Sequence, residues 1–179
     1  MRKLAFGIAT IVLSLAAFLA SARAQADNEG IVGTWIVTVT VNTPPGAPAF
    51  VFTDLIAFNQ GGTLTAASSA FNAHTSENPF LPAPLVVDTS DGYGVWKSTD
   101  DDSDRVAITF KRFLFAGAAT SSYAFAFPGQ YVGVNAVQAV GTLQDADHLA
   151  GSFTTEFKNL GGQVTFSGSG TFTATRLKN

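Results

Sequence analysis

The most informative absence in this sequence is cysteine, since its 179 residues contain none. Disulfide bonds, thiolate metal sites and cysteine nucleophiles are therefore excluded, and the fold must depend on its hydrophobic core. Only two histidines, His74 and His148, are present, and a metal centre usually needs about three or four ligands. The acidic stretch 100–104 lacks the glycine and the glutamate of an EF-hand-type calcium loop, so we interpret it as a solvated turn. We expect no metal and no cofactor.

Basic residues are also few, and three of the ten stand within the first 24 positions. Two of them precede an apolar stretch over residues 4–20, and small residues follow it. A basic head, an apolar stretch and an Ala-x-Ala site are the three parts of a secretory signal peptide. We predict that residues 1–24 are a cleaved signal peptide, with residues 1–26 as the alternative. Residues 25–179 would then form one lipocalin-like barrel domain.

Removal of the signal peptide leaves an acidic chain. Seven basic side chains then face thirteen acidic ones, which gives a formal charge of −6. Nucleic acids and anionic membranes both require Lys and Arg to neutralise their phosphates. We therefore expect no nucleic-acid partner and no stable membrane insertion after signal removal. The signal-peptide pattern itself predicts a secreted or periplasmic bacterial protein. The sequence leaves its oligomeric state open.

Strand and turn residues dominate the rest of the chain, where Val, Thr, Phe, Gly and Ser prevail. In the clearest strand, over 34–41, apolar and threonine side chains alternate between two faces. Residues 70–92, which contain three prolines, are expected to be irregular. Turn signals separate the expected strands, which lie near 34–41, 50–59, 63–69, 94–98, 105–115, 123–127, 130–143, 149–157 and 163–176. Because closure removes exposed sheet edges, we predict an all-β, single antiparallel up-and-down barrel of eight or nine strands.

The motif Gly33-Thr34-Trp35, which opens the first strand, resembles the Gly-x-Trp signature of lipocalins and related calycins. In that superfamily the tryptophan plugs the closed end of the barrel, and an arginine from the last strand packs across its ring. The resemblance assigns these roles to Trp35 and Arg176, a cation–π pair worth about 0.5–2 kcal/mol. The segments 58–64 and 92–96 are similar to those of short secreted bacterial proteins described as lipocalin-like. The resemblance thus implies a calycin-type barrel.

The aromatic content suggests a ligand cavity, because sixteen phenylalanines, two tryptophans and three tyrosines serve one small barrel. Barrels of about eight strands either fill with side chains or hold one small ligand. Asp54 alternates with apolar residues and is expected either to point inward or to occupy an edge or bulge position. An inward carboxylate would have to be paired or protonated. The predicted ligand-binding residues are Phe58, Trp96, Phe110, Tyr131, Phe153 and Asp54.

Three functions fit these observations. The first is binding of a small hydrophobic molecule in the barrel interior, for which an apolar cavity of roughly 300 Å³ or more is expected. The second is an enzyme of the allene-oxide-cyclase type, since such barrels steer a hydrophobic substrate by shape with few polar residues. The third is a filled barrel that acts as a structural or interaction protein, with residues 70–92 as its contact. No Gly-x-Ser-x-Gly elbow supports a hydrolase, and no catalytic residue is assigned.

Overall fold

Nine β-strands make up the computed structural model, which describes residues 30–43, 49–69, 87–99, 104–116 and 129–178. The strands are β1 (Gly33–Val41), β2 (Phe50–Phe58), β3 (Thr63–Ser68), β4 (Val87–Thr89), β5 (Gly92–Ser98), β6 (Arg105–Ala116), β7 (Tyr131–Leu143), β8 (His148–Asn159) and β9 (Val164–Arg176). The described residues include no helix that is long and apolar enough to cross a membrane. For this part of the chain the all-β prediction is confirmed.

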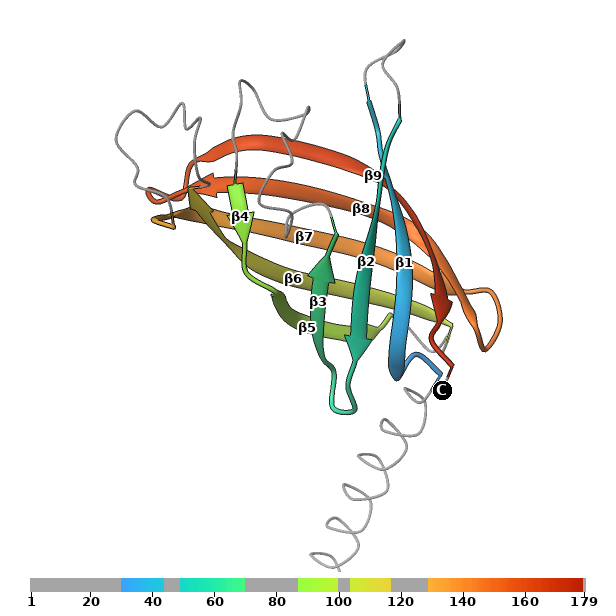
Figure 1. Ribbon diagram of the computed structural model, residues 1–179. Helices are drawn as coiled ribbons and strands as arrows, with labels where there is room; N and C mark the ends of the chain where they lie inside the picture. The colour runs from blue at the N-terminus through green and yellow to red at the C-terminus, as the bar shows by residue number, and fades with distance from the viewer. Residues whose placement is uncertain (1–29, 44–48, 70–86, 100–103, 117–128, 179) are drawn as a thin grey trace, which may run out of the picture.

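Eight of the strands close into a barrel. They pair antiparallel in chain order, and the pairings of β6 with β7 and of β1 with β9 complete the ring. The ninth strand, β4, pairs with residues 114–116 of β6, beyond the stretch 106–111 that pairs with β5. Figure 1 shows β1, β2 and β3 crossing in front of β6, β7 and β8. The predicted closed, antiparallel, up-and-down barrel is therefore confirmed.

The predicted loop over residues 70–92 is only partly irregular. The stretch 70–92 was expected to be irregular throughout, but it contains β4 and the first residue of β5, so the prediction is wrong there. The partner of β4 is the far end of β6, which the local sequence around the prolines does not reveal. The expected signal peptide and the expected strand 123–127 lie outside the described residues.

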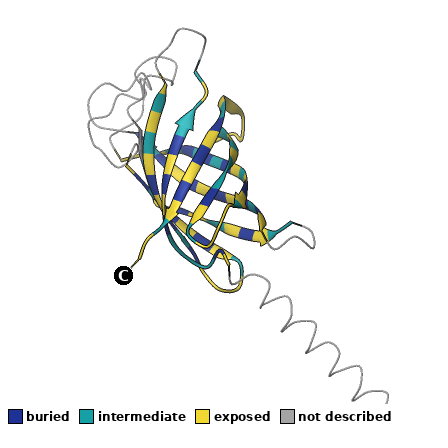
Figure 2. Ribbon diagram, turned by 90° about the vertical axis from the view of Figure 1, so that its right-hand side faces the viewer, coloured by how far each residue is buried: buried dark blue, intermediate teal, exposed yellow. Residues whose placement is uncertain are grey.

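Alternation of buried and exposed residues defines the inside of the barrel (Figure 2). In β6, for example, every second residue from Val106 to Ala116 is buried. Successive strand residues point to opposite faces, so these side chains point into the barrel. The largest fully buried side chains gather at the end where β1, β3, β6 and β8 begin, which we call the Trp35 end; they are Trp35, Ile31, Leu64, Leu149 and Val106.

Arg176 and Trp35 form the predicted pair at this end. The guanidinium carbon of Arg176 lies 4.3 Å from the centroid of the Trp35 ring, and the ring is fully buried. The indole Nε1 donates a hydrogen bond to the carbonyl oxygen of Ile31 at 2.9 Å. All three guanidinium nitrogens donate to backbone carbonyl oxygens, which belong to Ala146, Val32 and Gly30. The pair therefore ties the start of β1 to the end of β9 and to the β7–β8 turn.

Gly33 is required by this arrangement. Its φ angle is +136°, a conformation that L side chains rarely adopt. A Cβ atom at this position would also lie only 2.7 Å from Nη1 of Arg176. The glycine of the Gly-x-Trp motif thus makes room for the arginine that covers the tryptophan.

Candidate ligand-binding site

Beyond the packed Trp35 end, the barrel interior contains a cavity of about 90 Å³. This is more than one water molecule needs, whereas native interiors contain few voids larger than a water molecule. The cavity is nevertheless smaller than the roughly 300 Å³ expected of a site for a drug-sized ligand. Most of its wall is apolar, and its phenylalanines are Phe50, Phe52, Phe58, Phe110, Phe153, Phe157, Phe166 and Phe172.

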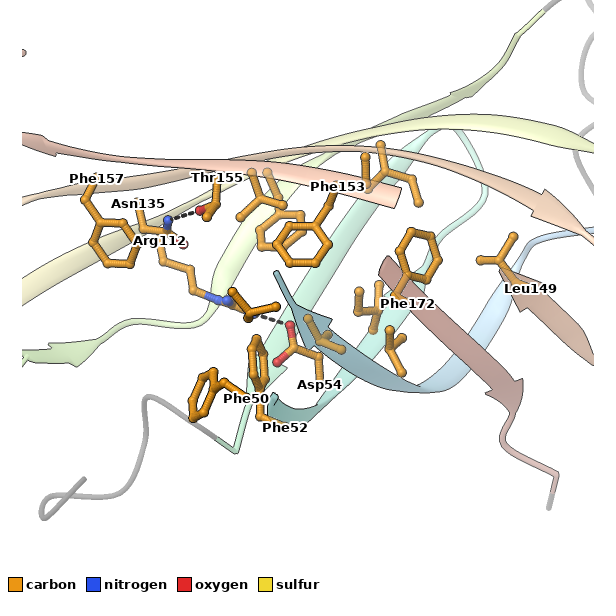
Figure 3. A pocket seen from close by; sticks show the side chains of 18 of the residues that line it. Phe50, Phe52, Asp54, Arg112, Asn135, Leu149, Phe153, Thr155, Phe157 and Phe172 are labelled. Carbon is orange, nitrogen blue, oxygen red and sulfur yellow. Dashed lines mark hydrogen bonds and ion pairs between the residues drawn. The ribbon is translucent and has the colours of Figure 1, made fainter. Parts of the chain in front are cut away.

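Four polar side chains interrupt this apolar wall (Figure 3). Asp54 comes from β2, Arg112 from β6, Asn135 from β7 and Thr155 from β8. Nη2 of Arg112 lies 2.8 Å from Oδ2 of Asp54, and the two side chains are only 3% and 5% exposed. A buried charge must be paired, and this ion pair satisfies that requirement for both groups.

Strand periodicity brings the two charged residues inside. Asp54 alternates with Phe52 and Ile56 along β2, and Arg112 follows Ile108 and Phe110 on the inner face of β6. The guanidinium carbon of Arg112 also lies 4.9 Å from the centroid of the Phe110 ring. In the sheet order β3 and β5 stand between β2 and β6, so the ion pair does not connect neighbouring strands. It links them through the barrel interior.

The two neutral polar residues form a second contact. Asn135 stands opposite Arg112 in the pairing of β6 with β7. Its Nδ2 donates a hydrogen bond to Oγ1 of Thr155 at 2.6 Å and another to the carbonyl oxygen of Glu156 at 3.4 Å. Asn135 is buried, and these bonds satisfy its amide hydrogens within the barrel wall.

One carboxylate oxygen of the site accepts no hydrogen bond from the described residues. Oδ2 of Asp54 accepts the hydrogen bond from Arg112, but Oδ1 accepts none from any residue that the structure describes. An unsatisfied buried acceptor costs about 1–3 kcal/mol, so such atoms are rare in native interiors. The cavity thus has a hydrogen-bond acceptor on an otherwise largely apolar wall.

Four of the six residues predicted to bind a ligand line the cavity: Phe58, Phe110, Phe153 and Asp54. Trp96 is buried but does not line it. The Trp96 ring lies edge-on to the ring of Phe58, with 6.1 Å between the centroids. Its Nε1 donates hydrogen bonds to the carbonyl oxygens of Asn59 and Thr63, each at 3.1 Å. Trp96 therefore belongs to the packed Trp35 end.

The inward orientation expected for Tyr131 is wrong. This residue is 41% exposed, and its ring contacts the rings of Phe113 and Phe115. The cause is an irregularity in the pairing of β6 with β7, where Leu114 faces Gly133 but the next residue, Phe115, faces Tyr131. One extra residue in β7 at this bulge reverses the alternation, so Tyr131 points outward although simple counting places it inside.

Arg112, Asn135 and Thr155 were not predicted as site residues. The sequence did contain a signal for Arg112, because it interrupts an otherwise apolar alternation along β6. Asn135 likewise precedes the inward residues Val137 and Ala139 at alternate positions. What the sequence lacked was the partner, since alternation places a side chain inside without showing which side chain it meets there.

No protein-family model matches this chain, and no curated protein sequence matches it significantly. Its function is therefore inferred from the geometry and chemistry of the cavity.

Proposed function

We propose that this chain is an exported, calycin-type barrel whose interior binds one small, mostly apolar molecule. The observation that carries the proposal is the 90 Å³ cavity with its phenylalanine-rich wall. Apolar cavities on the order of 150 Å³ bind a single aromatic ring, so the ligand here is at most of about that size. Its binding free energy would come chiefly from burial of apolar surface, at about 25 cal/mol per Å².

Further observations support the export and the calycin type. The pattern of residues 1–24 is that of a signal peptide, which supports release into the periplasm or the medium. The closed eight-stranded barrel supports the resemblance to calycins, and so does the stacking of Arg176 on Trp35 beside Gly33.

Toluene is a suitable probe for the proposed site because it is a single ring without a hydrogen-bonding group. The full chain is expressed in a bacterium, the exported protein is purified, and toluene is titrated while backbone amide resonances are followed by NMR. We expect saturable shifts in cavity-lining residues such as Phe153 and Val137, with little change at outward positions such as Thr171. Shifts that do not saturate, or that spread evenly over the barrel, would contradict the proposal.

A matched pair of variants controls for unspecific binding. Ala139 of β7 lines the cavity, so a leucine side chain in place of its methyl group would occupy much of the available space. Ala136 of the same strand has the opposite parity and does not line the cavity. We expect Ala139→Leu to abolish toluene binding and Ala136→Leu to preserve it. Equal effects of the two substitutions would place the binding elsewhere.

A second candidate is a barrel enzyme that acts on a small hydrophobic substrate. The buried pair of Asp54 and Arg112 favours it, because a carboxylate can accept a proton from a substrate and a neighbouring guanidinium can stabilise negative charge. Release of chemically unchanged ligand after incubation supports simple binding, whereas conversion of the ligand supports the enzyme.

A further inference from the structure

Oδ1 of Asp54 indicates which chemical group a ligand of this cavity carries. This inference rests on the proposed function, since it concerns the same cavity. Asp54 lines the cavity and its side chain is only 5% exposed. Because Oδ1 accepts no hydrogen bond from the described residues, it is an acceptor in a place where solvent has little access. A donor group on the ligand would satisfy it.

The ion pair of Asp54 and Arg112 also bears on the charge of the ligand. Arg112 would attract an anion if it stood alone, but its guanidinium is already paired with Asp54 at 2.8 Å. A carboxylate ligand would have to approach Arg112 beside the carboxylate of Asp54, and two like charges at such a distance repel each other. The ion pair therefore disfavours negatively charged ligands such as fatty acids.

A cationic ligand is not favoured either. The ion pair is neutral overall, and the rest of the cavity wall consists of apolar side chains with Asn135 and Thr155. Nδ2 of Asn135 is already engaged with Thr155 and Glu156. A full positive charge would thus lose its hydration in exchange for a carboxylate that Arg112 already neutralises.

We propose that the ligand is a neutral, ring-sized molecule that carries a hydroxyl group and donates its hydrogen bond to Oδ1 of Asp54. The hydroxyl hydrogen satisfies the buried acceptor, and the apolar body fills the space between the phenylalanine rings. Hydrogen bonds to charged groups are stronger than those between neutral groups, so the hydroxyl raises affinity rather than lowering it.

Phenol and toluene test this directly, because they have nearly the same shape and differ in a hydroxyl in place of a methyl group. A purely apolar cavity prefers toluene, since the hydroxyl of phenol loses its hydrogen bonds to water on entry. We expect the wild-type protein to bind phenol roughly tenfold more tightly than toluene at neutral pH, and to bind benzoate more weakly than either. Calorimetric titration of each probe gives the three affinities.

Two double variants locate the effect. Asp54→Leu/Arg112→Met removes both charges of the cavity together, so no unpaired charge remains buried, and we expect it to bind toluene more tightly than phenol. Glu156→Leu/Lys158→Met removes a surface ion pair of 2.9 Å, whose side chains are 47% and 39% exposed. This matched control is expected to keep the wild-type preference for phenol.

Each outcome has a distinct meaning. If wild type and the Asp54→Leu/Arg112→Met variant both prefer toluene, the hydroxyl inference is wrong while the proposed apolar site stands. Benzoate binding more tightly than phenol would overturn the inference in favour of an anion site at Arg112. If no probe binds to the wild-type protein, the proposed function itself fails.

Discussion

Two arginines of this barrel invite comparison, because each places its guanidinium near an aromatic ring in a different half of the molecule. Arg176 lies 4.3 Å from the Trp35 ring centroid, and Arg112 lies 4.9 Å from that of Phe110. The hydrogen bonds of Arg176 go to backbone carbonyl oxygens at the barrel end. Arg112 instead donates to the side chain of Asp54 on a strand that is not its neighbour.

The difference separates the packed end of the barrel from the part of its interior that contains the cavity. Every guanidinium nitrogen of Arg176 donates to a fixed carbonyl oxygen, and the largest fully buried side chains lie around the same end. Beyond that end, the Asp54–Arg112 pair lines a cavity, and Oδ1 of Asp54 accepts no hydrogen bond from the described residues. Buried polar atoms without a hydrogen-bond partner are rare in native interiors.

The largest expected effect comes from breaking the pair beside the cavity. Arg112→Met leaves the carboxylate of Asp54 buried without its partner, and we expect a loss of about 3–5 kcal/mol in the free energy of unfolding. The double variant Asp54→Leu/Arg112→Met removes both charges and should recover most of that loss. Urea denaturation of the single and double variants measures both values. If the double variant is as unstable as the single one, the two side chains have structural roles beyond their pairing.

The Trp35 end could be predicted from sequence because the Gly-x-Trp motif resembles that of calycins, and this resemblance assigned the roles of Trp35 and Arg176. Alternation within single strands gives the inner face, and Gly33, Trp35 and Arg176 stand at the start of the first strand and the end of the last strand. The pairing of β1 with β9 then brings Trp35 directly opposite Arg176. The fold was predictable for the same reason, since hairpins between successive strands leave few alternative arrangements.

The cavity was only partly predictable because its chemistry depends on contacts between distant strands. Asp54 and Arg112 meet through the interior, which no count along either strand can show. Tyr131 points outward because of a bulge at the β6–β7 pairing, which reverses the alternation over the first residues of β7. Alternation thus predicts faces well where strands are regular, and it fails beyond the first irregularity.

A smaller effect is expected from the pair at the Trp35 end. Trp35→Leu and Arg176→Gln, made separately and together, form a double-mutant cycle that isolates the stacking of the guanidinium on the indole. We expect a coupling energy of about 0.5–2 kcal/mol, measured by urea denaturation. Strictly additive losses would mean that the stacking on Trp35 contributes nothing, and that Arg176 stabilises the barrel through its bonds to carbonyl oxygens and its ion pair with Asp147.

The smallest expected effect concerns an exposed turn at the Trp35 end, where charge acts without burial. The backbone N–H of Asp147 and the ring of His148 both contact the carboxylate of Asp145, and these contacts lower the pKa of Asp145 from 3.8. A carboxyl group with a lowered folded-state pKa stabilises the fold above its unfolded value, and this contribution disappears as pH falls through the folded-state pKa. Asp145→Ala should therefore be less stable than wild type at neutral pH and converge with it as pH falls below 3.8 and through the lowered folded-state pKa. Urea denaturation at a series of pH values measures the difference between the two free energies of unfolding. If this difference stays constant down to the lowest pH, the charge of Asp145 contributes nothing to stability.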